Sequence, residues 1–275
     1  MKLFSKILFR VKFIFFGLLH LKSTINNFNY FRNIVFIVYS NGHTGSTTVY
    51  YNLLEQFPFV KIFHVHVLSD VWLKMGKMIK GDRNEILKNN VLNYKKKNPD
   101  KKYYHITMVR DPIERAISSF FYNQKYKKFK GPDFITNNNL EIFEKEIDFE
   151  KNVMWFDYDY NAYFKTNYQN LKFEKNKGFS ITKFDDKNYS LIIRTDKLNK
   201  IFSYAFYELI GFKPDELKSF NTRSQTNVGE LYKEFKNKLR LSDEKTLALL
   251  ENKFVKKFFT EAEIKQKIKK INKSK

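Results

Sequence analysis

Residues 33–48 read Asn-Ile-Val-Phe-Ile-Val-Tyr-Ser-Asn-Gly-His-Thr-Gly-Ser-Thr-Thr, and this stretch decides the fold. Its first half is a continuous β-branched and aromatic run, which predicts a strand buried on both faces. A polar turn with two glycines follows, and apolar residues then recur at helical spacing from Val49 to Leu54. A strand, a glycine-bearing loop and a helix in this order predict one unit of a parallel sheet.

The same alternation of strands and helices continues to the end of the chain. Further strands are predicted at 59–67, 103–109 and 189–193. Helices are predicted after the capping residues Ser69 and Asp111, at 198–210 before Gly211, and at 228–239 and 242–259. The sequence therefore predicts an α/β fold with a P-loop-type, doubly wound parallel sheet flanked by helices.

Composition divides the chain into three parts. Residues 1–32 form a basic, apolar N-terminal segment, residues 33–265 the α/β domain, and residues 266–275 a basic tail. Within the domain, the irregular residues 122–187 predict an insert or lid. The longest apolar stretch of the N-terminal segment, 13–19, is far shorter than the roughly 20 residues of a spanning helix. We expect a cytoplasmic protein whose N-terminal segment lies on the inner membrane face or packs on the domain.

The chain is strongly basic, with a formal net charge of +22 at pH 7. The first 32 residues carry six basic groups and no acid, and residues 256–275 carry eight lysines against two glutamates. Basic ends suit an anionic membrane surface or an acidic polymer, and they equally fit lysine-rich ends that only face solvent. The chain has no cysteine, which excludes disulfides, thiolate metal sites and cysteine nucleophiles.

The loop after the first strand has the composition of an anion-binding site. At a strand-to-helix junction, free backbone N–H groups and the positive end of the helix converge. Gly42 and Gly45 let the backbone curl around an anion, and Ser46-Thr-Thr48 add hydroxyl donors. The alternative is an ordinary turn of an α/β protein. The lysine that nucleoside triphosphatases carry in this loop is missing, which disfavours magnesium-dependent ATP or GTP hydrolysis.

A second motif, Val109-Arg-Asp-Pro-Ile-Glu-Arg-Ala-Ile-Ser118, ends the third predicted strand and begins a helix. Arg110 can bind a phosphate with both arms of its guanidinium group, and Ser118 can donate a further hydrogen bond. Alternatively, Arg110 pairs only with Asp111 or Glu114 at the start of the helix.

Together, the loop and this motif resemble the two signatures of sulfotransferases that use 3′-phosphoadenosine 5′-phosphosulfate. The resemblance implies that the 5′-phosphosulfate is bound by Gly42, His43, Thr44, Gly45, Ser46, Thr47 and Thr48. It implies that Arg110 and Ser118 bind the 3′-phosphate.

Over residues 33–265 the chain also resembles a bacterial family named for capsular polysaccharide synthesis. The stretches that carry this resemblance are 46–50, 64–68, 155–157, 175–179 and 193–198. One position departs from the sulfotransferase pattern, because His43 stands where a lysine or arginine usually stabilises the leaving oxygen. A protonated His43 can take that role, or the activity is lost.

The candidates for the general base are His64 and His66, which point to the same side of the second predicted strand. A His-x-His pair here resembles the catalytic histidines of uronyl 2-O-sulfotransferases, and we favour His66. The alternatives are hydrogen-bonded core histidines or half of a metal site. His105 is expected to be structural, and the aromatic residues of 155–160 either stack on sugars or pack in the core. Arg194 and Asp196 are expected at the ligand edge of the sheet, and Asn221 with Arg223 in a turn over the nucleotide.

The sequence thus predicts a sulfotransferase-like enzyme with 3′-phosphoadenosine 5′-phosphosulfate as co-substrate and no metal. Its acceptor would be a hydroxyl of a polysaccharide or glycolipid, in capsule or surface polysaccharide synthesis, and no specific nucleic acid is expected as a partner. One alternative is a P-loop kinase-like enzyme that requires magnesium. Another is a non-catalytic protein that binds polyanions or membranes through its charge.

Overall fold

A computed structural model describes residues 30–75, 82–126, 137–218 and 229–273 of the chain. Most of the N-terminal segment predicted at 1–32 and the last two residues of the predicted tail lie outside these ranges. So do Asn221 and Arg223, the residues expected in a turn over the nucleotide.

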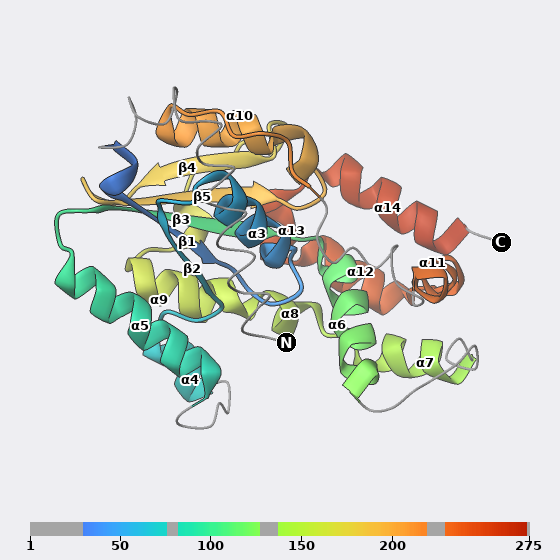
Figure 1. Cartoon of the computed structure of the whole chain (residues 1–275). Coiled ribbons are helices and arrows are strands. Elements are labelled where there is room, and N and C mark those ends of the chain that lie inside the picture. Colours follow the sequence, from blue (N-terminus) through green and yellow to red (C-terminus); the bar gives the residue numbers. More distant parts are fainter. Residues whose placement is uncertain (1–29, 76–81, 127–136, 219–228, 274–275) are drawn as a thin grey trace, which may run out of the picture.

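The described residues form one five-stranded sheet, in the order β2-β1-β3-β5-β4. Its strands are β1 (Ile34–Tyr39), β2 (Lys61–Val65), β3 (Lys102–Val109), β4 (Phe179–Lys183) and β5 (Asn188–Arg194). Strands β2, β1, β3 and β5 run parallel, while β4 pairs antiparallel with β5 at the edge. The predicted α/β class with a mostly parallel sheet is therefore confirmed (Figure 1).

Helices cover both faces of the sheet. Those of the first half are α3 (Ser46–Gln56), α4 (Asp70–Met75), α5 (Arg83–Lys97) and α6 (Pro112–Tyr126). The middle of the chain adds α7 (Asn137–Glu146), α8 (Phe149–Trp155), the π-helix η2 (Phe156–Tyr160), α9 (Asn161–Phe164) and the 3-10 helix η3 (Tyr168–Asn170). The last part adds α10 (Leu198–Ile210), α11 (Gly229–Lys238), α12 (Asp243–Glu251), α13 (Lys253–Phe258) and α14 (Glu261–Lys273).

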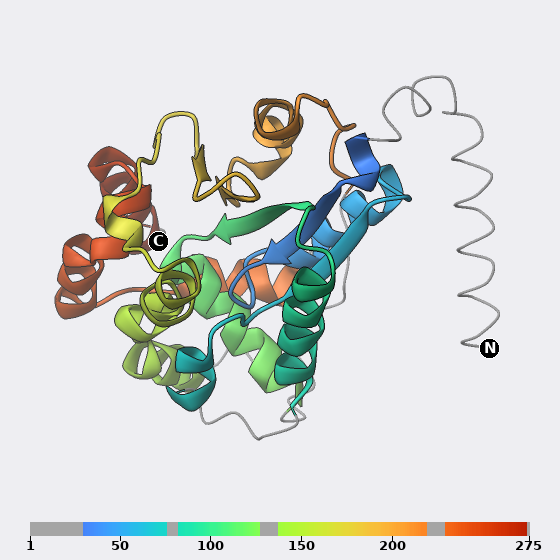
Figure 2. The same ribbon diagram turned by 90° about the vertical axis from the view of Figure 1, so that its left-hand side faces the viewer.

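Strand β1 explains the two-layer core, because all six of its residues are buried and they alternate between two apolar clusters. Phe36 and Val38 pack with residues of α3 and α10 on one face. Ile37 and Tyr39 pack on the other face with residues of α5, α6, α8 and the C-terminal helices. Figure 2 shows α10 on one side of the sheet and the larger helical layer on the other. A continuous apolar run was the signal for this two-sided burial.

Local capping signals in the sequence are matched by hydrogen bonds. The amide of Glu114 donates to Asp111 Oδ1 (3.0 Å) at the start of α6, and the amide of Trp72 donates to Ser69 Oγ (3.2 Å) at α4. Helix α10 ends at Gly211, whose φ of 72° is the left-handed conformation that glycine adopts readily. The helix predicted at 242–259 is instead two helices, because Asn252 caps the start of α13 with its side chain.

The region predicted as an irregular insert contains regular structure. Residues 122–187 include the end of α6, helices α7 to α9 and strand β4. Strand β4 pairs with β5 alone and alternates polar with apolar residues over only five positions, a weak signal for a strand. The boundary predicted between 265 and 266 falls inside α14, in which Ile264 is buried and Ile268 packs on the core.

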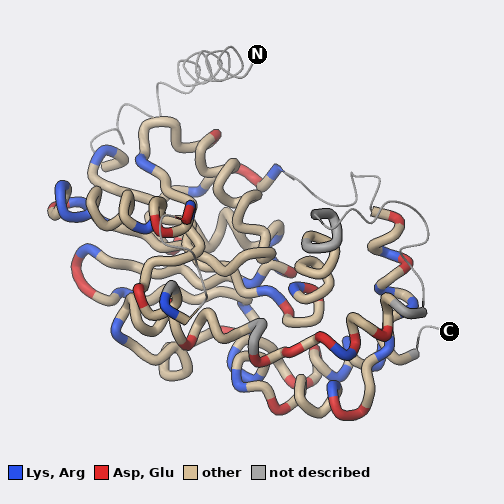
Figure 3. Tube along the Cα trace, turned by 90° about the horizontal axis from the view of Figure 1, so that it is seen from below, with Lys and Arg blue, Asp and Glu red and all other residues tan. Residues whose placement is uncertain are grey.

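Two further properties of the described residues concern the surface. None of the helices in these ranges is both long enough and apolar enough to cross a membrane. Figure 3 shows Lys and Arg interspersed with Asp and Glu along the chain trace. The basic residues are therefore spread over many elements.

Candidate anion-binding site

The loop at 40–45 lies where β1 meets β3, at the carboxyl ends of both strands. Strand β2 pairs with one side of β1 and β3 pairs with the other, so the chain changes direction at this point of the sheet. Ligands of open α/β sheets bind at such a switch point. Ser40 Oγ ties the loop to β3, since it bonds both the amide and the carbonyl of Met108 (3.2 Å each).

The loop backbone is curled, and side chains bond four of its carbonyl groups. His43 and Gly45 both have positive φ values, 65° and 88°. Four successive carbonyl oxygens accept hydrogen bonds from side chains: Asn41 O from Thr44 Oγ1 (2.8 Å), Gly42 O from Arg115 Nε (3.0 Å), His43 O from Arg110 Nη1 (2.9 Å) and Thr44 O from Thr195 Oγ1 (2.8 Å). These side chains hold the loop backbone in its curled conformation, and the amide of Gly42 donates to Asn41 Oδ1 (2.9 Å).

Helix α3 adds its positive end to this loop. Its N-cap residue is Gly45, which has no side chain with which to cap the first amides. A Cβ atom on Gly45 would lie 3.4 Å from Thr195 Cγ2, so the loop packs closely against the β5–α10 turn. The predicted loop residues Gly42 to Thr48 are therefore together at one helix terminus, with the dipole favouring negative charge.

The predicted anchor Arg110 does reach the loop. Besides its bond to His43 O, its Nη2 lies 3.4 Å from Tyr232 Oη and 3.8 Å from Glu114 Oε2. The predicted pairing with Glu114 is thus present, but it is long. Ser118 is buried in α6 at 6% exposure, eight residues beyond Arg110.

Arg115 is a site residue to which sequence reasoning assigned no role. It holds Gly42 O from the first turn of α6, and burial together with the charge of Arg110 lowers its pKa to about 10. Arg110 and Arg115 thus place two guanidinium groups at the loop, bonded to the neighbouring carbonyls of His43 and Gly42. The sequence signal that could have identified Arg115 is its position in the same motif, five residues after Arg110.

His64, in β2, and His66, directly after it, lie on the same side of the sheet, as their spacing predicted. Their ring centres lie 5.0 Å apart. His64 Nε2 is 2.9 Å from Ser46 Oγ, and the ring stacks on Tyr50. Burial, followed by the charges of His66 and Arg83, lowers the pKa of His64 to about 4. His64 is therefore neutral at pH 7 and is bonded to a hydroxyl of the loop.

His66 is held in one defined tautomer. Its Nδ1 lies 2.6 Å from Ser40 O, and since a carbonyl can only accept, Nδ1 carries the proton. Neutral His66 then has its lone pair on Nε2. Burial lowers the pKa of His66 against the opposing effect of the Ser40 bond, and the charges of Arg83 and Arg115 lower it further. An uncharged imidazole with a free Nε2 lone pair is what a general base requires.

The backbone around His66 is held by the π-helix region. Trp155 Nε1 donates to His66 O (2.6 Å), and the buried carboxylate of Asp159 accepts from the amides of Leu68 (3.1 Å) and Ser69 (2.7 Å). Tyr39 donates its hydroxyl to the same carboxylate (2.7 Å). The turn that carries His66 is therefore fixed from the far side of the sheet.

Other predicted candidates lie away from an open site. Trp155, Phe156 and Tyr160 are at most 3% exposed, so they pack in the core and cannot stack on a sugar. His105 is fully buried between Tyr189 O and Tyr163 Oη (3.0 Å each), with its pKa lowered by burial to about 3, as suits a structural residue.

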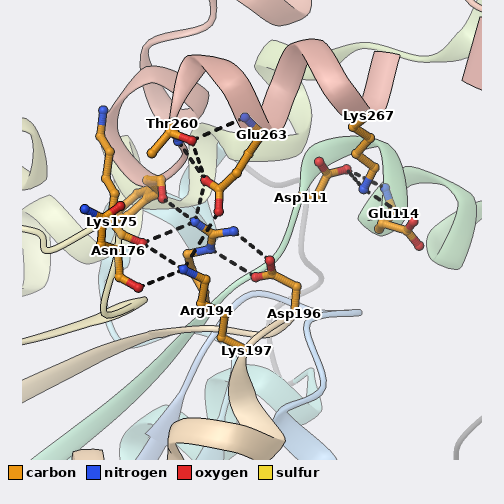
Figure 4. Close-up of polar contacts among 11 residues, drawn as sticks. Asp111, Glu114, Lys175, Asn176, Arg194, Asp196, Lys197, Thr260, Glu263 and Lys267 are labelled. Atoms are coloured by element: carbon orange, nitrogen blue, oxygen red, sulfur yellow. Dashed lines mark hydrogen bonds and ion pairs between the residues drawn. The ribbon is translucent and has the colours of Figure 1, made fainter. Parts of the chain in front are cut away.

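Arg194 lies at the carboxyl end of β5, but its guanidinium group is already occupied. It bonds both oxygens of Asp196 (3.0 and 2.6 Å) and Glu263 Oε2 (2.9 Å), as Figure 4 shows. It also lies over the ring of Phe259. Its role is to join β5 to α14.

His43 is partly buried in the loop. Its ring packs edge-to-face against Tyr122, whose side chain is 43% exposed, with ring centres 4.8 Å apart. Within the described ranges, no group of three or more His, Asp or Glu side chains is arranged to hold a metal ion. The pair His64 and His66 thus has no third ligand there.

No protein-family model, curated protein or solved structure matches this chain, so the site is interpreted from its own geometry.

Proposed function

We propose that this site belongs to a nucleotide-dependent group-transfer enzyme, and specifically to a sulfotransferase that uses 3′-phosphoadenosine 5′-phosphosulfate. One observation carries the proposal. The imidazole of His66 is bonded through Nδ1 to Ser40, the residue that begins the anion-binding loop, and its Nε2 lone pair accepts no hydrogen bond from the residues that the structure describes. A base and an anion cradle are thereby coupled, and the loop lacks the lysine of a kinase-type site.

In the proposed reaction His66 removes the proton of an acceptor hydroxyl. Nε2 takes that proton while the hydroxyl oxygen forms a bond to sulfur, and the bond between sulfur and the bridging phosphate oxygen breaks. The amides of the loop and of α3 stabilise the negative charge left on the nucleotide phosphate. His43, when protonated, would add a positive charge at the loop in place of the usual lysine or arginine.

The two histidines have different roles in this scheme. His64 Nε2 is engaged with Ser46 Oγ, so His64 orients a hydroxyl of the loop toward the donor. His66 acts as the base, because its Nδ1 bond directs the opposite nitrogen to the acceptor. Arg110 anchors the 3′-phosphate, and Ser118 would add a hydrogen bond after rearrangement within α6.

For the acceptor we propose a hydroxyl of a polysaccharide or glycolipid, in capsule or surface polysaccharide synthesis. This part rests on the resemblance of residues 33–265 to the capsular polysaccharide family. A location in the cytoplasm, with peripheral contact to an anionic membrane through the basic N-terminal segment, fits that acceptor.

Calorimetric titration with 3′-phosphoadenosine 5′-phosphate tests the proposal, with adenosine 5′-phosphate and ATP as controls and a chelator present. We expect binding that requires the 3′-phosphate and is lost in Arg110→Ala. Equal binding of all three nucleotides would refute the sulfotransferase assignment. Binding that requires magnesium and ATP would favour the kinase-like alternative, and salt-sensitive binding of any polyanion the non-catalytic one.

A further inference from the structure

The carboxylate of Glu114 is surrounded by cations from two helices and from the turn before α6. Lys236 Nζ of α11 lies 2.6 Å from Glu114 Oε1, and Lys267 Nζ of α14 lies 3.3 Å from the same oxygen. Arg110 Nη2 is more distant, at 3.8 Å from Oε2. Figure 4 shows Lys267 reaching both Asp111 and Glu114 from α14, and its distance to Asp111 Oδ1 is 2.9 Å.

The charges of this cluster balance without Arg110. The two carboxylates, Asp111 and Glu114, face two lysines at shorter distances than the guanidinium group. Because the attraction between charges falls with distance, the lysines compensate most of the carboxylate charge. The pKa of Glu114 also depends more on the two lysines than on Arg110. Burial would raise this pKa, but Lys267, then Lys236, then Arg110 lower it to about 2.

Arg110 lies two residues before α6 and Glu114 lies in its first turn, and Arg110 Nη2 is within ion-pair distance of Glu114 Oε2 (3.8 Å). If the lysines were absent, Arg110 would be the nearest counter-charge for Glu114. Its guanidinium group would then be drawn toward that carboxylate and away from a ligand.

We propose that Lys236 and Lys267 neutralise Glu114 and so keep Arg110 available to bind an anion at the loop. The C-terminal helices α11 and α14 are by this inference part of the anion site, although they lie outside the loop and its motif. The inference rests on the proposed function in one respect: it assumes that the natural anion is a phosphate group of the donor nucleotide.

The test is the double variant Lys236→Met with Lys267→Met, titrated with 3′-phosphoadenosine 5′-phosphate and, separately, with inorganic pyrophosphate. We expect affinity to fall about 3- to 10-fold, because each pair is partly exposed. The matched control is Lys238→Met with Lys265→Met, on the same two helices. These lysines pair with Glu234 and Glu261 of their own helices, so the control removes the same net charge.

Two further variants separate this mechanism from a structural effect. Adding Glu114→Gln to the double lysine variant should restore affinity, because the competing carboxylate is gone. In an Arg110→Ala background the lysine substitutions should have no more effect than the control pair. Helix α14 stays docked in these variants through Glu263 and Arg194, which thermal unfolding verifies.

Each outcome decides the inference. Failure of Glu114→Gln to restore affinity would overturn it, since the lysines would then contact the anion directly. Equal losses in the control pair would also overturn it. If wild type binds pyrophosphate but shows no preference for the nucleotide, the proposed function fails while the pyrophosphate series still tests the lysines. If wild type binds neither anion, both proposals are overturned.

Discussion

Asp159 provides the sharpest test of how the turn at His66 is held. Its side chain is fully buried and accepts three hydrogen bonds, from the amides of Leu68 and Ser69 and from the hydroxyl of Tyr39. Asp159→Ala leaves three buried donors without an acceptor. Each buried donor left without an acceptor costs about 1 kcal/mol or more, and a water molecule that enters the cavity can satisfy part of this loss. We therefore expect the free energy of unfolding to fall by about 3–5 kcal/mol.

Asp159→Asn should behave differently. The amide oxygen can accept from Leu68 and Ser69, while the amide nitrogen donates to the hydroxyl of Tyr39, which can reverse its role. We expect a loss of only about 1 kcal/mol, similar to that of Tyr39→Phe. Asp157→Asn is the control on the same π-helix, because Asp157 is exposed and surface changes of this kind stay within about 0.5 kcal/mol.

Urea denaturation followed by tryptophan fluorescence measures these differences, since Trp155 lies directly beside the turn and bonds His66 O. If Asp159→Ala costs less than about 1 kcal/mol, or if Asn and Ala cost the same, the carboxylate does not hold the turn and the reasoning is wrong.

Three further predictions follow from the site. Gly45→Ala should cost about 1–2 kcal/mol and weaken anion binding, because Gly45 has φ 88° and a Cβ would lie 3.4 Å from Thr195. Gly42→Ala, with no atom within 4 Å of its Cβ position, is the control for stability in the same denaturation series, where an equal loss would contradict the reasoning. His66→Gln should lower the rate of sulfuryl transfer at least about 100-fold with unchanged nucleotide affinity, and a rate that is insensitive to this substitution would remove His66 as the base. Because the pKa of His66 is lowered from its usual value of 6.5, the wild-type rate should fall only below pH 6.5. The contribution of Glu114 to stability should be constant above about pH 4.5 and should be lost as the pH drops toward 2, since the pKa of Glu114 is lowered from 4.5 to about 2 in the folded protein. In Glu114→Gln, acid unfolding between pH 4.5 and 2, monitored by circular dichroism, should depend less on pH than in the wild type, and an unchanged profile would contradict this.

Much of the fold could be predicted from neighbouring residues alone. The run at 34–39 indicated a strand with two buried faces, and Asp111, Ser69 and Gly211 marked helix ends correctly. These signals act within one strand or one helical turn, so they need no knowledge of the rest of the chain. Strand β4 was not predicted, because a short edge strand forms only when it pairs with its neighbour, here β5, and this pairing leaves little signal in its own residues.

The sequence by itself determined the α/β class, the anion-binding composition of the loop, and the shared side of His64 and His66. Only the tertiary structure decided how the loop is oriented. Arg115 bonds Gly42 across 73 positions, Thr195 bonds Thr44 across 151, and Lys236 reaches Glu114 across 122. Such contacts depend on how β3, β5 and the C-terminal helices pack around the first loop, and packing over these separations leaves no local pattern in the chain. The tautomer of His66 was decided in the same way, by the Ser40 carbonyl that the sheet places beside it.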